Sequence, residues 1–360
     1  MKRRIVLFAL CMACVPFLYG KGLKKAYKKY FDIGVAVNIR NVTDAGQGEL
    51  LCQEFNSITA ENAMKPASTH PRNGVYTWEG ADRIADFCRK HKIKMRGHCL
   101  VWHNQFCDWM FTDDNGNPVS KEVFYERLRE HIHVVVNRYK DVVYCWDVVN
   151  EAIADGGPNP YRESRLFKLC GEEFIAKAFE FAREADPKAL LFYNDYNAII
   201  PHKRDNIYNM VKKMKEAGVP IDGIGMQGHY NVHWDNLKDV EAAIKKYSEL
   251  VDIIHITELD MRANTDMGGN LDFKKKAEMQ ITDEIKQKQE ERYVGLFRVL
   301  REHKKVIKSV TFWNLSDKDS WLGTHNYPLL FDKEYQPKEA YYKVRETYNR
   351  LWCYAIRNLD

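Results

Sequence analysis

The sequence predicts an α/β fold, a closed (β/α)8 barrel (TIM barrel), from three observations. Eight strand-like segments alternate with helical ones, which is the strand count of such a barrel. The length of 360 residues suits one large barrel domain with insertions. No glycine-rich phosphate-binding loop follows the first segment, which disfavours the open doubly wound sheet that is the alternative.

The eight predicted strands are short apolar runs that end at or next to polar residues. They cover residues 32–37, 55–60, 94–101, 144–151, 190–193, 224–226, 251–257 and 310–312. Polar groups at the ends of parallel strands meet at one rim of a barrel. We therefore expect the functional side chains there.

Helical periodicity fills the intervals between these strands. Residues 80–91 place Ala81, Ile84, Ala85 and Cys88 on one face. Ser120 is expected to open a long helix, and Gly218 to end another. The charged run 272–292 is interpreted as a solvated helix face, so residues 21–360 form a single domain.

Residues 1–20 predict export. Three basic residues precede an apolar run at 5–18, which is typical of a secretory signal peptide and too short to span a bilayer comfortably. Cys14, after Ala13, allows a lipoprotein signal and a lipid anchor as the alternative. We therefore expect a secreted, periplasmic or cell-surface protein.

Composition narrows the function classes. Without residues 1–20, 52 basic residues oppose 50 acidic ones, which gives no reason to expect nucleic acid as a partner. Seven cysteines remain, an odd number without a close CxxC pair, which disfavours a disulfide framework and a zinc site. Whether any two of them pair is left open by their spacing.

Two glutamates at predicted strand ends indicate a chemistry. Glu151 and Glu258 end the fourth and seventh strands and so face each other across the mouth. Glycoside hydrolysis needs such a pair, one carboxyl to protonate the leaving oxygen and one to attack or to activate water. We expect His229 to keep Glu258 ionised, and Glu151, beside Trp146, to stay protonated.

Six blocks of residues, in order, carry a family resemblance. They are residues 61–66, 97–105, 144–151, 227–229 and 257–260, and then Trp313 with Asp317, Ser320 and Trp321. From about residue 23 to 350 the sequence resembles glycoside hydrolase family 10, the retaining endo-1,4-β-xylanases. The resemblance implies xylan and xylo-oligosaccharides as substrates, with no cofactor, no metal and no obligate protein partner.

The resemblance also implies roles for individual residues. Glu151 matches the acid/base and Glu258 the nucleophile, which His229 hydrogen-bonds, with Asp147 behind that histidine. Asn150 matches the asparagine that binds the 2-hydroxyl of the reacting sugar. The implied substrate-binding residues are Glu61, Asn62, Lys65, His98, Trp102, Gln105, Gln227, Tyr196, Trp313 and Trp321.

Three loop residues depart from the family pattern. Phe106 and Cys107 stand where a proline or similar residue is expected, and Asn314 stands where glycine usually follows the tryptophan. These positions put fine specificity in doubt, and the sequence leaves activity on cellulose or mixed-linkage glucan open. Two other readings are a non-catalytic sugar-binding barrel and a metal-dependent barrel hydrolase that uses His98, His103 and His229.

Overall fold

The computed structural model describes residues 22–263 and 281–346. The predicted signal segment 1–20, its lipoprotein alternative and the first part of the charged run at 272–292 lie outside these residues.

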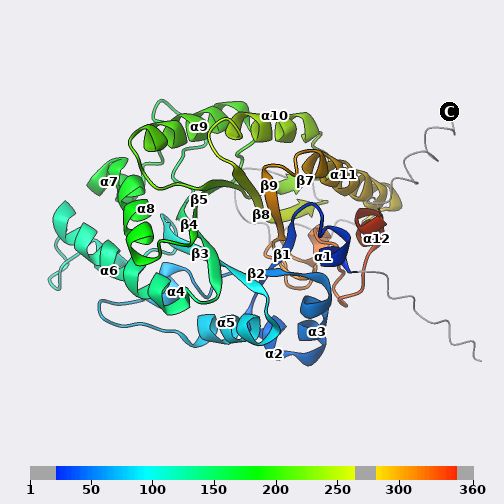
Figure 1. Ribbon diagram of the computed structural model, residues 1–360, viewed down its shortest axis with the longest axis horizontal. Coiled ribbons are helices and arrows are strands. Elements are labelled where there is room, and N and C mark those ends of the chain that lie inside the picture. Colours follow the sequence, from blue (N-terminus) through cyan, green and yellow to red (C-terminus); the bar gives the residue numbers. More distant parts are fainter. Residues whose placement is uncertain (1–21, 264–280, 347–360) are drawn as a thin grey trace, which may run out of the picture.

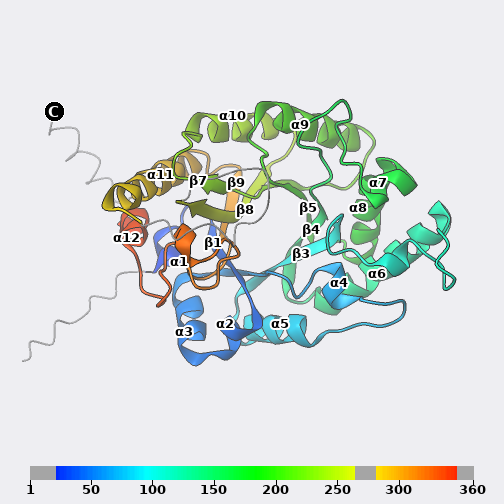
Figure 2. The ribbon, with the colours of Figure 1, turned by 180° about the vertical axis from the view of Figure 1, so that it is seen from behind.

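Eight parallel strands close into a barrel in the described part of the chain, which confirms the predicted fold class (Figures 1 and 2). Neighbouring strands pair in chain order, and the β6–β8 and β1–β9 pairings complete the ring. The barrel strands are β1 (Asp32–Val37), β2 (Ser57–Ala60), β3 (Lys94–Trp102), β4 (Val143–Asn150), β5 (Leu190–Asp195), β6 (Gly223–Met226), β8 (Ile253–Arg262) and β9 (Ile307–Phe312). A short strand, β7 (His229–Asn231), pairs with the C-terminal end of β8.

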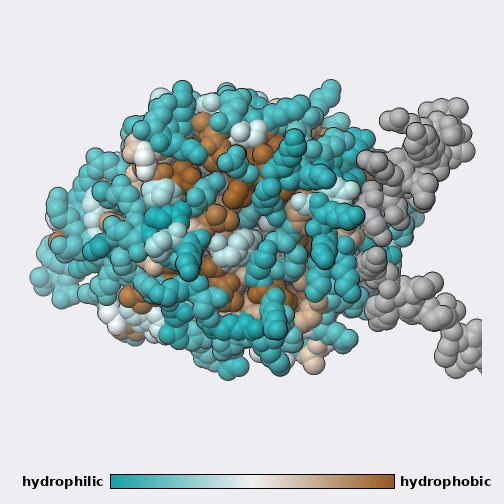
Figure 3. Space-filling view, in the orientation of Figure 1, coloured by the Kyte–Doolittle hydropathy of each residue, from teal (hydrophilic) through white to brown (hydrophobic). Residues whose placement is uncertain are grey.

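Helices surround the barrel in both ribbon views (Figures 1 and 2). They are α1 (Leu23–Ala26), α2 (Ile39–Thr43), α3 (Ala45–Glu54), α4 (Pro66–Thr69), α5 (Glu79–His91), α6 (Lys121–Tyr139), α7 (Arg165–Cys170), α8 (Glu173–Ala185), α9 (Pro201–Glu216), α10 (Leu237–Tyr247), α11 (Asp283–Glu302) and α12 (Glu339–Glu346). The rim of the face in Figure 3 is mainly hydrophilic, with hydrophobic residues towards its centre. None of the described helices is long and apolar enough to cross a membrane.

The helix signals in the sequence are confirmed. The predicted apolar face of α5 is buried, and the Ser120 side chain caps α6 by accepting a hydrogen bond from the Val123 amide. Gly218 follows α9 with φ 76°, the left-handed conformation in which glycine commonly terminates a helix.

The prediction that a strand ends before Glu258 is wrong, because β8 continues to Arg262. The register of β8 against β9 shifts between Ile256 and Leu259, so this part of the strand is bulged and Glu258 lies inside it. On the other side of β8, Gly228 with φ 85° interrupts the sixth strand and divides it into β6 and β7. The bulge and the interruption together shape this part of the barrel mouth.

The barrel interior combines apolar packing with buried charged groups. A Cβ on Gly97 would lie 2.0 Å from the Trp146 ring, so the indole occupies the space that a side chain at residue 97 would need. Arg96 and Asp147 are both fully buried and paired at 2.6 Å. The six cysteines in the described residues are free thiols.

Candidate active site

Glu258 is buried within β8 among nitrogen donors. Its Oε1 accepts a hydrogen bond of 2.8 Å from the Asn194 Nδ2, and its Oε2 lies 3.3 Å from the His229 Nε2. The His98 ring lies further off, with Nδ1 4.0 Å from Oε1. Both carboxylate oxygens therefore have a partner on the protein.

These neighbours hold Glu258 in its ionised form. Burial raises its pKa, but the hydrogen bond from His229 and the charges of His98 and His229 outweigh burial, so the pKa lies below its ordinary value. Burial lowers the pKa of His229, yet Asp260 and Glu258 raise it to about 10. A cationic imidazole next to a carboxylate is thus the stable arrangement.

The carboxylate behind His229 is Asp260, which corrects the expectation that Asp147 lies there. The Asp260 Oδ2 lies 2.8 Å from the His229 Nδ1 and accepts a hydrogen bond of the same length from the Trp321 indole. Strand register explains the difference, since His229 on β7 is paired with Asp260 on β8.

Asp147 instead lies on β4 beside His98 of β3. It binds Arg96 through both guanidinium Nη atoms, at 2.6 and 3.2 Å, and His98 through Nδ1 at 2.9 Å. Burial raises the pKa of Asp147, but Arg96 and His98 prevail and lower it to about 2. Asp147 therefore orients His98, which in turn lies near Glu258.

Glu151 is the first residue after β4, and its surroundings differ from those of Glu258. Its Oε2 accepts a hydrogen bond of 2.8 Å from the Trp102 indole. Its Oε1 accepts hydrogen bonds of 2.9 Å from the Gln227 Nε2 and of 3.3 Å from the Asn150 Nδ2. The indole at this carboxyl group is that of Trp102, not of Trp146 as the sequence suggested. These three donors are neutral N–H groups.

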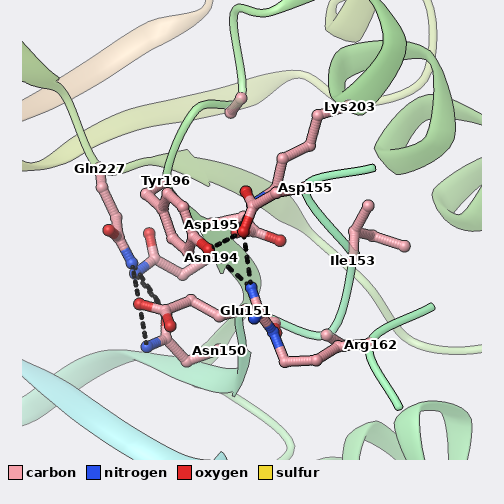
Figure 4. A network of polar contacts seen from close by, with 12 residues as sticks. Asn150, Glu151, Ile153, Asp155, Arg162, Asn194, Asp195, Tyr196, Lys203 and Gln227 are labelled. Atoms are coloured by element: carbon pink, nitrogen blue, oxygen red, sulfur yellow. Dashed lines mark hydrogen bonds and ion pairs between the residues drawn. The ribbon is translucent and has the colours of Figure 1, made fainter. Parts of the chain in front are cut away.

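A chain of side-chain amides connects the two carboxyl groups. Figure 4 shows Glu151 with the amides of Asn150, Asn194 and Gln227. The Asn150 side chain is buried. Its Oδ1 lies 2.9 Å from the Asn194 Nδ2 and 3.2 Å from the Gln227 Nε2. Asn194 reaches Glu258, and Gln227 reaches Glu151. The two carboxyl groups are thus linked through three neutral side-chain amides.

Two of the tryptophans named as substrate-binding residues pack against the histidines near Glu258. Trp313 is buried, and its ring packs edge-on against His98 with the ring centres 5.2 Å apart. Trp321 is more exposed and packs edge-on against His229 with the same distance between ring centres. The Lys65 ammonium lies 4.8 Å from the centre of the Trp102 ring. Indole surfaces and polar groups lie side by side, as a site for a hydroxylated ring requires.

Glu61, Asn62 and Lys65 form a polar group just after β2. The Lys65 Nζ donates 2.8 Å to the Asn62 side-chain oxygen. Burial raises the pKa of Glu61, an effect that Lys65 and a hydrogen bond with Asn314 partly offset. The contact between Glu61 and Asn314 therefore links the loop that follows β2 to the loop that follows β9.

The two remaining predicted substrate-binding residues lie further out. Gln105 is exposed in a left-handed backbone conformation, φ 51°, and its carbonyl accepts 3.0 Å from the Ala67 amide. Tyr196 follows β5 as a half-buried residue and donates to Asp155 through its hydroxyl. The Lys203 ammonium lies 3.5 Å from the centre of the Tyr196 ring.

The loop departures have physical explanations. Asn314 has φ 95°, a conformation that favours glycine, and its side-chain oxygen accepts 3.3 Å from the Trp321 amide. The buried Cys107 thiol donates to the His70 carbonyl at 3.3 Å. Each side chain thus makes a contact that a glycine or proline lacks.

Sequence reasoning missed three contributors to the site. Asn194 and Asp260 stand at strand positions that the strand-end rule could have marked, but only the structure shows their contacts with Glu258 and His229. Arg162 has no local signal in the sequence, because it reaches Glu151 from eleven residues further along the chain. No three His, Cys, Asp or Glu side chains among the described residues are grouped so as to hold a metal ion.

Fold and site together define a class. A (β/α)8 barrel with two carboxyl groups in contrasting environments, set among amides and indoles at its mouth, has the arrangement that glycoside hydrolases use. The family model for glycosyl hydrolase family 10 matches residues 22–347. The chain belongs to this family.

Individual relatives are similar over most of the chain. The endo-1,4-β-xylanase/feruloyl esterase of Xylanibacter ruminicola is 58% identical over 92% of this chain, which spans 47% of that protein. Endo-1,4-β-xylanase B of Paenibacillus barcinonensis is 43% identical, over 89% of this chain and 97% of that protein. A solved psychrophilic family 10 endo-β-1,4-xylanase is 60% identical with a TM-score of 0.87, covering 91% of this chain and 99% of its own.

Proposed function

We propose that the chain is an exported endo-1,4-β-xylanase that hydrolyses internal bonds of xylan with retention of configuration. The observation that carries this proposal is the contrast between its two carboxyl groups. Glu258 is kept ionised by His229, whereas Glu151 is held by neutral N–H donors. Support for the substrate comes from the relatives, which are named endo-1,4-β-xylanases.

In the first step a Glu258 oxygen attacks the anomeric carbon while the bond from that carbon to the leaving oxygen breaks. Glu151 transfers its proton to the leaving oxygen, which departs as a sugar hydroxyl. Asn194 hydrogen-bonds Glu258 Oε1, the His98 ring lies near the same oxygen, and His229 faces Oε2. The product of this step is a covalent glycosyl–enzyme ester.

In the second step Glu151 takes a proton from water, and the water oxygen attacks the anomeric carbon. The ester bond to Glu258 breaks, which restores both carboxyl groups and releases a sugar of the original configuration. In this proposal Asn150, whose amide contacts Asn194 and Glu151, binds the 2-hydroxyl of the reacting sugar. Hydrogen bonds to this hydroxyl strengthen in the transition state.

Two alanine variants test the division of roles. Glu258→Ala should abolish turnover of every substrate. Glu151→Ala should lose activity on xylo-oligosaccharides yet keep a fast first step with dinitrophenyl xylobioside, whose leaving group needs little protonation. Equal losses on both substrates for Glu151→Ala would refute its role as the acid.

Substrate and export need separate measurements. Incubation with xylan and with cellulose should release xylo-oligosaccharides of several lengths from the first and little from the second. Release of cello-oligosaccharides at a comparable rate would replace the proposed substrate with a broader β-glycan. N-terminal sequencing of the protein from the producing cells should begin near Lys21; a lipid-modified Cys14 would indicate the anchored alternative.

A further inference from the structure

The backbone of Glu151 has an uncommon conformation that its surroundings must maintain. Its φ is 59°, in the left-handed region that costs a non-glycine residue free energy. On one side, its amide donates 2.9 Å to the Asn194 carbonyl. On the other side, its carbonyl accepts 3.0 Å from the Arg162 Nε. The Arg162 side chain thus hydrogen-bonds directly to the backbone of this glutamate.

The loop after β4 folds back to bring Arg162 to this position. Ile153 and Tyr161 form an antiparallel bridge, and the Arg162 amide donates 2.8 Å to the Ala152 carbonyl. The next two amides after Glu151, those of Ala152 and Ile153, each donate 3.0 Å to the Tyr193 hydroxyl. Residues 151–153 are therefore held from both strand β5 and the returning loop.

The guanidinium group of Arg162 is itself fixed by a polar network (Figure 4). Its Nη2 donates 2.7 Å to the Tyr196 hydroxyl and lies 3.4 Å from the Asp155 carboxylate. The buried Lys203 ammonium lies 2.9 Å from both Asp155 and Asp195. Positive and negative groups therefore alternate in this network, in the order Arg162, Asp155, Lys203 and Asp195.

This geometry leaves Arg162 little freedom, because its Nε and Nη2 point at two different partners. A planar guanidinium can satisfy both at once, whereas the single ammonium of a lysine can occupy only one of the two places. Arg162→Lys would keep the positive charge but could not hydrogen-bond the Glu151 carbonyl and the Tyr196 hydroxyl at the same time. The left-handed backbone of Glu151 would then be held less firmly, because the contact at its carbonyl would be lost or weakened.

We propose that Arg162 is a positioning residue that sets the carboxyl group of Glu151 for proton transfer to the leaving oxygen. The inference rests on the proposed role of Glu151 as the acid. Arg162 does not contact the reacting atoms through this link; it acts through the Glu151 carbonyl. Its effect should therefore depend on how much the leaving group needs a proton.

The test is the dependence of kcat/KM on the leaving group. We expect Arg162→Lys to lower kcat/KM for phenyl xylobioside and for xylo-oligosaccharides by about tenfold or more, the size of one lost charge-assisted hydrogen bond. On dinitrophenyl xylobioside the loss should stay below about threefold, since misplacing the acid matters little there. Arg165→Lys is the matched control, because Arg165 is half exposed, pairs with the exposed Asp108 and should change neither value.

A second variant guards against misfolding of the first. Tyr196→Phe keeps the ring but removes the hydroxyl that holds the Arg162 Nη2, and we expect the same leaving-group dependence with a smaller loss. For either variant, equal losses on both substrates, or no loss on either, would overturn the inference. Failure of the proposed function is recognised separately, since Glu151→Ala would then itself show no leaving-group dependence.

Discussion

Replacing His229 by glutamine isolates the charge that keeps Glu258 ionised. The His229 Nε2 lies 3.3 Å from the Glu258 Oε2, and Asp260 holds the imidazole in its cationic form. Glutamine keeps a donor of similar reach but carries no charge. The substitution therefore removes an electrostatic effect and leaves much of the packing.

The size of the effect follows from the burial of Glu258. An opposite charge at hydrogen-bonding distance lowers a carboxyl pKa by about 1–3 units, or roughly 1.4–4 kcal/mol. Burial, which raises the pKa of Glu258, remains in the variant. Attack requires the ionised form, whose population falls as the pH drops through this pKa. Because His229→Gln raises the pKa, the acidic limb of kcat/KM should move upwards by about one pH unit or more.

The assay is the pH profile of kcat/KM on an aryl xylobioside from acidic to mildly alkaline pH. His233→Gln is the control, because His233 lies just beyond β7, the strand that carries His229, and its Nε2 lies 3.0 Å from the Ala263 carbonyl oxygen. Its profile should overlay that of the parent chain. An acidic limb that stays in place in His229→Gln, or that moves to lower pH, would refute the electrostatic role of the histidine.

Three further results are expected. Asp147→Asn should lower the free energy of unfolding in urea by about 3–5 kcal/mol, because it leaves Arg96 as an unpaired buried cation. Gly97→Ala should destabilise the barrel by about 1–3 kcal/mol or more, since the new methyl group would overlap Trp146. Exhaustive chelation should leave kcat/KM unchanged, because the proposed mechanism uses carboxyl groups alone.

Each of these results has its contrary outcome. Asp141→Asn breaks an exposed pair with Arg89 and should lower the free energy of unfolding by less than about 1 kcal/mol. An equally small loss for Asp147→Asn would contradict the argument that its buried ion pair matters more. Gly156→Ala meets no neighbouring atom within 4 Å and should be nearly neutral, so equal destabilisation at Gly97 and Gly156 would contradict the packing argument. Activity lost to chelation and restored by one divalent cation would favour a metal-dependent hydrolase.

Much of the fold could be predicted because its signals are local. Alternation of apolar strands with amphipathic helices gave the barrel, and Ser120 and Gly218 marked helix ends by their own conformational preferences. The rule that polar residues gather at the ends of barrel strands predicted that Glu151 and Glu258 share one mouth, although Glu258 lies inside β8 and not at its end. These inferences need only the residues next to one another in the chain.

The rest depends on contacts between distant segments. Asp260, not Asp147, supports His229, because the bulge in β8 and the break at Gly228 set a register that no periodicity reveals. In the same way, Arg162 reaches Glu151 only because the loop after β4 folds back on itself. Partners chosen by register and by loop closure lie beyond what spacing along one chain predicts.

Trapping the covalent intermediate identifies the nucleophile directly. A 2-deoxy-2-fluoro xylobioside with a good leaving group slows both steps, so the glycosyl–enzyme ester should accumulate to one fluorinated xylobiosyl group per chain. Intact mass followed by peptide mapping should then place the label on Glu258. A label on Glu151, or complete inactivation without any covalent adduct, would contradict the assignment of the two carboxyl groups.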